Sequence, residues 1–484
     1  MKNKKKKEGK VIDVAIKDVV EPGMCQFMGA SIVRMLPHAI DGLKPVQRKI
    51  LWSMYYTKVF QFDKCSSIVG DVAKFLTTGD DSVYPALTKM AQTFRNQHMP
   101  IEMYGNQGYI TDNKEPAAKR YTEAKLSEYG LDLYFDEDIK FGDYVDNYNE
   151  RYREPTILPT VLPMSLIMGG KGTATGYTNQ ILPHSLESVA KCYIEFIKCM
   201  NGKSKWEKFD KFVEDNIHLG IPNRSKLINR DAVARGLLTS SAKLTMDGRM
   251  KVVESSYGRK AIVITELPFE LSVVDFIESL KCKESIELFS EVNDYSSKDG
   301  INIEIILKKA TSIAKAEELI YTKTRFRMKY NYTMNFVLKD IDGCEALVKR
   351  LTIHEIFKLH YFYKRETLKR FLSDKKNSLE YKYDCLVASD LIFSNPKNKK
   401  KFFKILEEST KKNVVRNILK AFNVKASTVD YVLNRNMWNL VHNSEEIKIE
   451  LSNIQKELDV VMSDLDNIDD YLVRKIKNIV KKYK

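Results

Sequence analysis

A heptad repeat near the C-terminus constrains the fold of this chain more than any other feature. Its apolar residues follow one another at steps of four and three: Ile447, Leu451, Ile454, Leu458, Val461, Leu465, Ile468 and Leu472. Such a seam is typical of helices that pack as a left-handed coiled coil. A second long helix without Pro or Gly is predicted over residues 353–387, after a capping box formed by Thr352 and Glu355. The two helices would form an antiparallel arm with a small globule, residues 388–441, at its tip; a plain helical bundle is the alternative.

The residues before this arm mix helices with strands. Residues 12–36 are predicted to form a helix that breaks at Pro22 and Gly23. Residues 64–97 predict two short helices separated by a turn at residues 77–80, as in a helix-turn-helix. Residues 261–265 predict a buried strand, a capped helix follows Ser272, and residues 301–307 alternate as on a half-buried strand. The pattern therefore predicts a multidomain α+β protein.

Charge and composition narrow the class of partner. The 484 residues include 79 Lys and Arg against 64 Asp and Glu, which gives a net charge of +15. This balance suits a polyanion, although lysine-rich helices can also be solvated faces. Seven scattered cysteines without a C-x-x-C pair indicate reduced thiols inside a cell. No apolar run is long enough to cross a bilayer.

Two segments resemble nucleotide-binding or metal-binding motifs, but each lacks a feature that such a motif requires. Residues 169–173 are rich in glycine around Lys171 but lack the spacing of a phosphate-binding loop. The acidic residues 136–138 lack the companion glutamate that a nuclease-like metal site needs. We therefore expect no metal ligands on this chain.

Two other segments have the composition of a functional site. Residues 41–48 place a turn before a helix, with Pro45 in its first turn and cations beside it. Residues 116–123 follow a turn that contains Gly105 and Gly108. The small residues of that segment would let another backbone approach closely, with Arg120 and Tyr121 presented beside it.

In their order and spacing these motifs resemble the DNA-breaking subunit of type IIA topoisomerases. This family includes the A subunits of bacterial gyrase and topoisomerase IV and the medium subunit of a T4-like phage enzyme, which is closest in layout. The matching motifs cover nearly the whole chain: residues 41–48, 68–72, 89–92, 105–108, 117–123, 143–148, 158–160, 172–179, 181–184 and 261–268.

The resemblance implies a division into five parts. These are an N-terminal basic tail and helix (1–29), a winged-helix breakage-reunion domain (30–154), a mixed α/β tower domain (155–340), a coiled-coil arm (341–387 and 442–484) and a helical C-gate globule for dimerisation (388–441).

The resemblance also implies roles for individual residues. Tyr121 would be the catalytic nucleophile, forming a transient 5′-phosphotyrosyl link, and Arg120 its transition-state partner. Gln47 and Thr78 stand where the family has histidines, and Thr173 where it inserts an apolar side chain between base pairs. The residues that would bind DNA are Arg34, Lys44, Gln47, Arg48, Lys74, Thr78, Ser82, Lys171 and Thr173.

The implied partners follow from the same resemblance. They are double-stranded DNA, a second copy of the chain joined through the C-gate, and a TOPRIM and ATPase subunit that holds Mg²⁺ and ATP. The setting would be the cytoplasm of a bacterial or phage-infected cell, with no membrane contact. Such an enzyme relaxes or decatenates DNA by ATP-dependent strand passage. The alternative is a catalytically inactive paralogue that binds and bends DNA in an architectural role.

Overall fold

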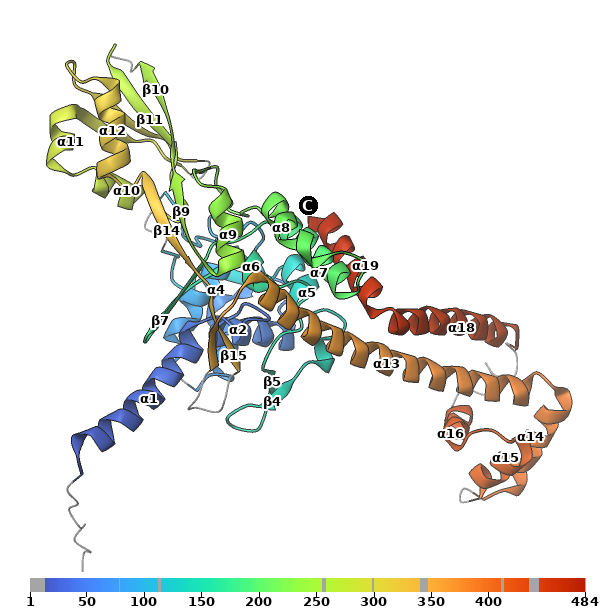
Figure 1. Cartoon of the computed structure of the whole chain (residues 1–484). Coiled ribbons are helices and arrows are strands. Elements are labelled where there is room, and N and C mark those ends of the chain that lie inside the picture. Colours follow the sequence, from blue (N-terminus) through green and yellow to red (C-terminus); the bar gives the residue numbers. More distant parts are fainter. Residues whose placement is uncertain are drawn as a thin grey trace, which may run out of the picture. The chain divides into compact units, whose positions relative to one another are not determined.

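The computed structural model is a mixed α+β protein whose sheets are antiparallel (Figure 1). It describes residues 14–77, 79–111, 115–254, 258–297, 300–339, 347–410, 413–434 and 444–483. These residues form two compact units. One contains the described residues up to Lys364 together with those from Ile476 onward, and the other contains Arg365–Lys475.

A three-stranded sheet and a group of helices begin the first unit. Helix α2 contacts α3, α4 and the central strand β3, so the buried faces of these elements share one core. The two short helices predicted over residues 64–97 are present as α3 and α4. The elements are α1 (Ile16–Met35), α2 (Pro45–Tyr56), β1 (Asp63–Lys64), α3 (Cys65–Ala73), η1 (Asp80–Ser82), α4 (Val83–Ala91), β2 (Ile101–Tyr104), β3 (Glu123–Leu126) and α5 (Glu128–Tyr134).

The predicted helix break at Pro22 is wrong. Helix α1 runs from Ile16 to Met35 with Pro22 inside it. A proline there removes one backbone hydrogen bond, the one to the carbonyl of Asp18. Both residues are exposed, so water can take the place of the missing donor.

Two larger sheets form the middle of the first unit. The five-stranded sheet has the order β6-β7-β14-β9-β8 and the four-stranded sheet has the order β10-β11-β13-β12. Their strands are β6 (Gly170–Ala174), β7 (Tyr177–Ile181), β8 (Lys226–Leu227), β9 (Ser241–Asp247), β10 (Arg249–Glu254), β11 (Lys260–Glu266), β12 (Phe289–Asp294), β13 (Ile303–Leu307) and β14 (Arg327–Thr333).

Three elements predicted for this region are present. The buried strand at residues 261–265 is β11. The strand predicted over residues 301–307 is β13, but the prediction that it is half-buried is wrong, because every residue of β13 except Glu304 is buried. The hydroxyl of Ser272 accepts a hydrogen bond from the backbone amide of Asp275 and starts α10 (Val273–Ser279). Helices α10, α11 (Lys283–Leu288) and α12 (Ile313–Lys323) pack beside the four-stranded sheet, where α10 and α12 share a buried cluster with β11 and β13 (Figure 1).

The remaining elements connect these layers. They are η2 (Ile139–Phe141), β4 (Tyr144–Asp146), β5 (Arg153–Pro155), α6 (Met164–Ile167), α7 (Leu186–Met200), η3 (Trp206–Lys208), α8 (Phe209–Asn216), α9 (Asp231–Thr239), β15 (Asn335–Lys339) and β16 (Leu347–Arg350). The last residues of the chain bind α5 in the same unit, because Lys482 Nζ lies 2.8 Å from Glu128 and 2.6 Å from Asp132.

The second unit is helical throughout its described residues. It contains most of α13 (Ile353–Phe393), which begins at the predicted capping box of Thr352 and Glu355. The other helices are α14 (Pro396–Glu408), α15 (Val414–Phe422), α16 (Ala426–Asn434), α18 (Ser444–Asp466) and the first part of α19 (Ile468–Tyr483).

The heptad seam forms part of the core of this second unit. Ile447, Ile454 and Leu458 belong to one buried cluster with α13, α14, α15 and α16. Two ion pairs, Lys382 with Glu450 and Arg365 with Asp469, join α13 to α18 and α19. Because the partner's number falls as the number on α13 rises, the paired helices run antiparallel.

We predict that a charge at Leu458 will unfold this unit selectively. Leu458 is 5% exposed inside the cluster, so Leu458→Asp buries an unpaired carboxylate where a leucine packed. The expected loss of stability is on the order of 4 kcal/mol. Val460→Asp is the matched control, because Val460 is 58% exposed on the same helix. Urea unfolding followed by helical circular dichroism should show an early transition only for Leu458→Asp, and equal midpoints for the two variants would contradict the prediction.

Candidate active site

Arg120 and Tyr121 lie together on an exposed loop before β3. The Tyr121 side chain is 65% exposed, and the guanidinium carbon of Arg120 lies 4.7 Å from the centre of its ring. The backbone amide of Tyr121 donates to the carbonyl of Ala118 at 2.9 Å, which closes a tight turn. A phenol oxygen and a guanidinium are therefore presented to solvent side by side.

Hydrogen bonds to α4 and α3 fix the residues on both sides of this pair. The Tyr84 hydroxyl of α4 donates to the carbonyl of Ala117 at 2.5 Å and lies 2.9 Å from the hydroxyl of Thr122. Thr122 is fully buried, and its carbonyl accepts from the amide of Cys65 at 3.0 Å. The exposed Tyr121 thus precedes a residue that is fixed in the core.

Gly105 shows why this region needs glycine. Its φ is +98°, and an added Cβ would lie 3.3 Å from both the Tyr121 carbonyl and the Thr122 side chain. A larger residue would be strained in this left-handed conformation and would press on the loop. The close approach predicted from the small residues of segment 116–123 therefore involves Gly105 of the preceding turn and the backbone of Tyr121.

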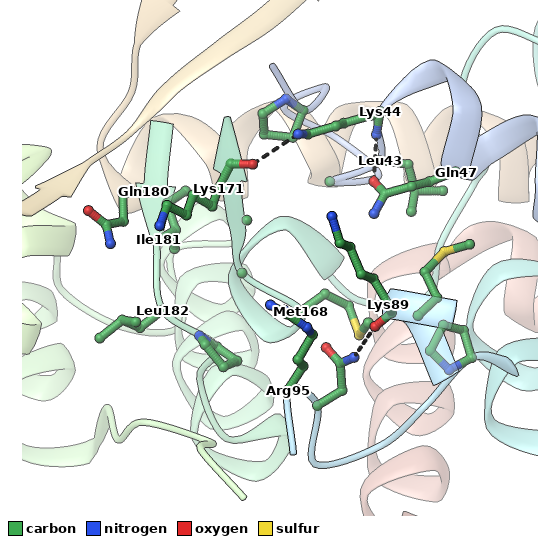
Figure 2. A pocket seen from close by; sticks show the side chains of 18 of the residues that line it. Leu43, Lys44, Gln47, Lys89, Arg95, Met168, Lys171, Gln180, Ile181 and Leu182 are labelled. Carbon is green, nitrogen blue, oxygen red and sulfur yellow. Dashed lines mark hydrogen bonds between the residues drawn. The ribbon is translucent and has the colours of Figure 1, made fainter. Parts of the chain in front are cut away.

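A basic cleft of about 500 Å³ lies in the same unit (Figure 2). Four cations line it: Lys44 at the start of α2, Lys89 on α4, Arg95 after α4 and Lys171 on β6. Helix α4 therefore contributes Lys89 to the cleft and Tyr84 to the loop of Tyr121.

The cations of this cleft are close enough to repel one another. The Lys44 ammonium donates to the backbone carbonyl of Lys171 at 2.9 Å, while the Gln47 side chain accepts from the Lys44 amide at 3.0 Å. Burial, and after it the charge of Lys89, lowers the pKa of the Lys44 amine. Among the described residues Lys89 has no carboxylate within ion-pair distance. An anion in the cleft would relieve this repulsion.

The structure brings together only some of the predicted DNA-binding residues. Lys44, Gln47 and Lys171 line the cleft, and Thr173 is exposed on the same strand as Lys171, two residues along and thus on the same face. Arg34 is exposed in the last turn of α1, and Ser82 is exposed just before α4. Lys74 is exposed and paired with Asp71 at 2.5 Å. Thr78 lies outside the described residues.

Arg48 does not line the cleft. Its side chain is buried, and its guanidinium donates to both carboxylate oxygens of Asp41 at 2.6 and 3.0 Å and to the Leu43 carbonyl at 3.2 Å. The family resemblance implied that Arg48 binds DNA, whereas in this structure its guanidinium is engaged with Asp41 and Leu43 inside the protein. DNA binding by Arg48 stays a prediction.

The acidic residues 136–138 have a structural partner instead of a metal. Asp136 and Asp138 accept hydrogen bonds from the fully buried ammonium of Lys364 at 3.1 and 2.7 Å, and the Pro159 carbonyl accepts a third. Across the described part of the chain, no group of three or more His, Cys, Asp or Glu residues could hold a metal ion.

Sequence reasoning missed Tyr84, Lys89 and Arg95. Lys89 begins the motif at residues 89–92. It lies seven residues, or about two helical turns, after Ser82, so the two residues share a helix face, and this spacing could have indicated that Lys89 belongs to the site. Arg95 pairs with Glu270, which is 175 residues away, so no local pattern indicates it.

Comparison with known proteins identifies similar chains. The family of DNA gyrase/topoisomerase IV A subunits matches residues 34–478. The chain is 30% identical over 361 residues to the A subunit of DNA topoisomerase 4 from Staphylococcus epidermidis, which covers 71% of this chain and 44% of that protein. It is also 30% identical over 334 residues to the corresponding A subunit from Staphylococcus aureus strain NCTC 8325, covering 66% of this chain and 40% of that protein. The chain thus spans less than half the length of these relatives. No helix built from described residues is long and apolar enough to cross a membrane.

We predict that Lys89→Ala will weaken binding of duplex DNA in a salt-dependent way. Losing one phosphate contact should lower affinity several-fold at low salt and reduce the slope of log Kd against log salt by about 1. Lys211→Ala on α8 is the control, because Lys211 is exposed and outside the cleft. Fluorescence anisotropy with a labelled duplex at several salt concentrations measures both quantities. Equal slopes for the two variants would remove Lys89 from the interface.

Proposed function

Because the chain belongs to the family of DNA gyrase/topoisomerase IV A subunits, we propose that it is the DNA-cleaving and rejoining subunit of a type IIA topoisomerase. The observation that carries this proposal is the exposed pair of Arg120 and Tyr121 at the end of a strand anchored in the core. This pair, just before β3, combines an accessible hydroxyl, an adjacent guanidinium and a backbone fixed on both sides, as a nucleophile and its electrostatic partner require.

The proposed reaction is a transesterification at a DNA phosphate. The Tyr121 phenol oxygen attacks phosphorus and forms a bond to it, while the bond from phosphorus to the 3′ oxygen breaks. The phosphate stays attached to the 5′ oxygen of the cut strand, which gives a 5′-phosphotyrosyl link. The phenol loses its proton and the departing 3′ oxygen gains one, so the step needs no oxidant or nucleotide. The reverse step reseals the strand. The Arg120 guanidinium can donate two hydrogen bonds to phosphoryl oxygens as charge develops on them.

Duplex DNA is proposed to lie along the basic cleft. Lys44, Lys89 and Lys171 would contact phosphates, and Gln47 stands where a family histidine would be. Thr173 is exposed on the β6–β7 hairpin, opposite Thr178. Its short polar side chain is a poor wedge between base pairs, so bending would depend more on phosphate contacts than on intercalation.

The proposed architecture follows the family. Helices α3 and α4 with the three-stranded sheet would form the winged-helix domain (30–154), and the two larger sheets the tower (155–340). Residues 341–387 and 442–484 would form the coiled-coil arm, and residues 388–441 the C-gate through which two copies dimerise. The antiparallel pairing of α13 with α18 and the buried seam support this assignment.

A second subunit is proposed to supply the remaining chemistry. A TOPRIM chain would hold the Mg²⁺ that stabilises charge on the departing 3′ oxygen, and an ATPase module would drive strand passage. The described residues of this chain offer no group of three or more His, Cys, Asp or Glu that could hold a metal ion. Relaxation or decatenation would take place in the cytoplasm of a bacterial or phage-infected cell.

The competing proposal is an inactive paralogue that binds and bends DNA. It is favoured by the replacement of the family histidines at Gln47 and Thr78, which removes groups that could accept a proton or donate to the phosphate. The two proposals differ in one observable, a covalent bond between protein and DNA.

We predict that Tyr121→Phe will abolish covalent DNA adducts and leave DNA affinity within about twofold. The variant removes one exposed oxygen, whereas affinity depends on many phosphate contacts. The assay incubates the chain with a TOPRIM/ATPase partner, Mg²⁺ and plasmid, denatures the mixture and maps the DNA-bound peptide. Tyr148→Phe is the control, because Tyr148 is a similarly exposed tyrosine at 61%. An adduct on another residue would refute the assignment of Tyr121, and no adduct from the wild type would favour the architectural role.

We predict that Arg120→Lys will slow cleavage about a hundredfold without abolishing it. The lysine keeps the charge but loses the planar pair of donors. The measurement is the rate of adduct formation at saturating DNA, with Lys119→Arg as a control that preserves charge at the neighbouring position. A rate equal to that of the wild type would show that Arg120 does not contact the reacting phosphate.

A further inference from the structure

We propose that Tyr84 is a positioning residue that holds the backbone on both sides of Tyr121 and links it to the DNA-contacting helix α4. This inference rests on the proposed function, because it assigns Tyr84 to the same reaction. Tyr84 does not itself reach the exposed phenol of Tyr121. It acts through Ala117, four residues before the nucleophile, and through Thr122, directly after it.

One hydroxyl makes both contacts in complementary roles. The Tyr84 O–H donates to the Ala117 carbonyl, so its oxygen is left to accept the hydrogen of the Thr122 hydroxyl, 2.9 Å away. Thr122 is 0% exposed, so water cannot replace the phenol as its partner. Losing this hydrogen bond removes a partner of the buried Thr122 hydroxyl, which is more costly than a loss at a surface.

The backbone of Thr122 is fixed by a second anchor. Its carbonyl accepts from the Cys65 amide at 3.0 Å, at the start of α3. The side chain is fixed by α4 and the backbone by α3, so residue 122 is held by both short helices. Among the described residues, Tyr121, one residue earlier, is held by the turn bond to Ala118 and the contact with Arg120. The direction in which its phenol points is therefore set by how firmly Thr122 and Ala117 are held.

Helix α4 joins this clamp to the basic cleft. Tyr84 and Lys89 lie five residues apart on it, a rise of about 7.5 Å. A short rigid helix that contacts DNA at Lys89 thus carries the hydroxyl that positions the nucleophile loop. Displacing a reacting group by about 1 Å can cost a hundredfold in rate, so loosening this clamp should affect the chemical step.

The test compares variants that remove one hydroxyl each. Tyr84→Phe and Thr122→Val break the contact from either side, and Thr122→Ser keeps the hydroxyl. Tyr363→Phe is the matched control, because the Tyr363 hydroxyl also bridges two backbone groups, accepting from the Asp143 amide and donating to the Ile157 carbonyl, away from Tyr121. All four are assayed as full-length chains with the TOPRIM/ATPase partner and Mg²⁺.

The first readout separates binding from chemistry. At saturating DNA we expect Tyr84→Phe and Thr122→Val to form the Tyr121 adduct at least tenfold more slowly, with Kd for DNA within twofold of the wild type. Thr122→Ser and Tyr363→Phe should keep the wild-type rate. The double variant of Tyr84→Phe with Thr122→Val should be no slower than the slower single variant, because both remove one shared contact. A rate for Tyr84→Phe within twofold of the wild type would overturn the proposal. If Tyr84→Phe does not fold, Thr122→Val decides by the same criterion.

The second readout does not need the reaction. Lys119 and Arg120 are exposed trypsin sites inside the clamped segment. We expect trypsin to cut there about tenfold faster in Tyr84→Phe than in Tyr363→Phe, and equal rates would count against the clamp. If the wild type forms no adduct while the two variants still differ in proteolysis, the proposed function fails and the positioning by Tyr84 stands.

Discussion

The carboxylate of Asp41 is the contact on which the arrangement of the cleft depends. It is completely buried and accepts from the Arg48 guanidinium and from the amides of Leu43 and Leu158. Burial alone would raise the pKa of Asp41, but Arg48, His38 and the Leu158 amide together outweigh burial and hold that pKa below its usual value. One charged group thereby ties the turn before α2, the helix itself and a segment 117 residues away. Removing either partner would leave an uncompensated buried charge, which typically costs about 3 to 5 kcal/mol.

The buried pair of Asp41 and Arg48 lies next to the residues that line the basic cleft. The Arg48 side chain is paired inside the protein, whereas Lys44, the residue that precedes α2, lines the cleft. There it meets Lys89 and Lys171 with few carboxylates to balance them, and its pKa falls through burial and through the charge of Lys89. A polyanion that enters the cleft turns the same repulsion into binding energy.

The sequence predicted the features that depend on local spacing. The heptad seam, the caps at Ser272 and Thr352 and the strands β11 and β13 follow from periodicity and from side chains three residues apart. Local spacing could not predict the features that depend on solvent or on groups far apart in the sequence. The helix α1 continues through Pro22 because solvent satisfies the orphan carbonyl, and Arg48 turns inward to a carboxylate that only the folded turn positions. The buried ammonium of Lys364 lies 226 residues from Asp138 in sequence. No local pattern could predict that Asp136 and Asp138 pair with this lysine, or that Arg95 pairs with Glu270.

The proposed role of Tyr121 as nucleophile sets two requirements that normally conflict. Such a residue must be open to a large substrate, which favours a loop, but it must also be held still, which favours a strand or helix. The structure places Tyr121 two residues before β3, the central strand of the sheet, which is paired with β1 on one side and β2 on the other. Exposure falls from 65% at Tyr121 to 0% at Thr122. The rigid, doubly paired strand and the buried threonine therefore fix the backbone from which an exposed phenol projects, so that access is gained without loss of order.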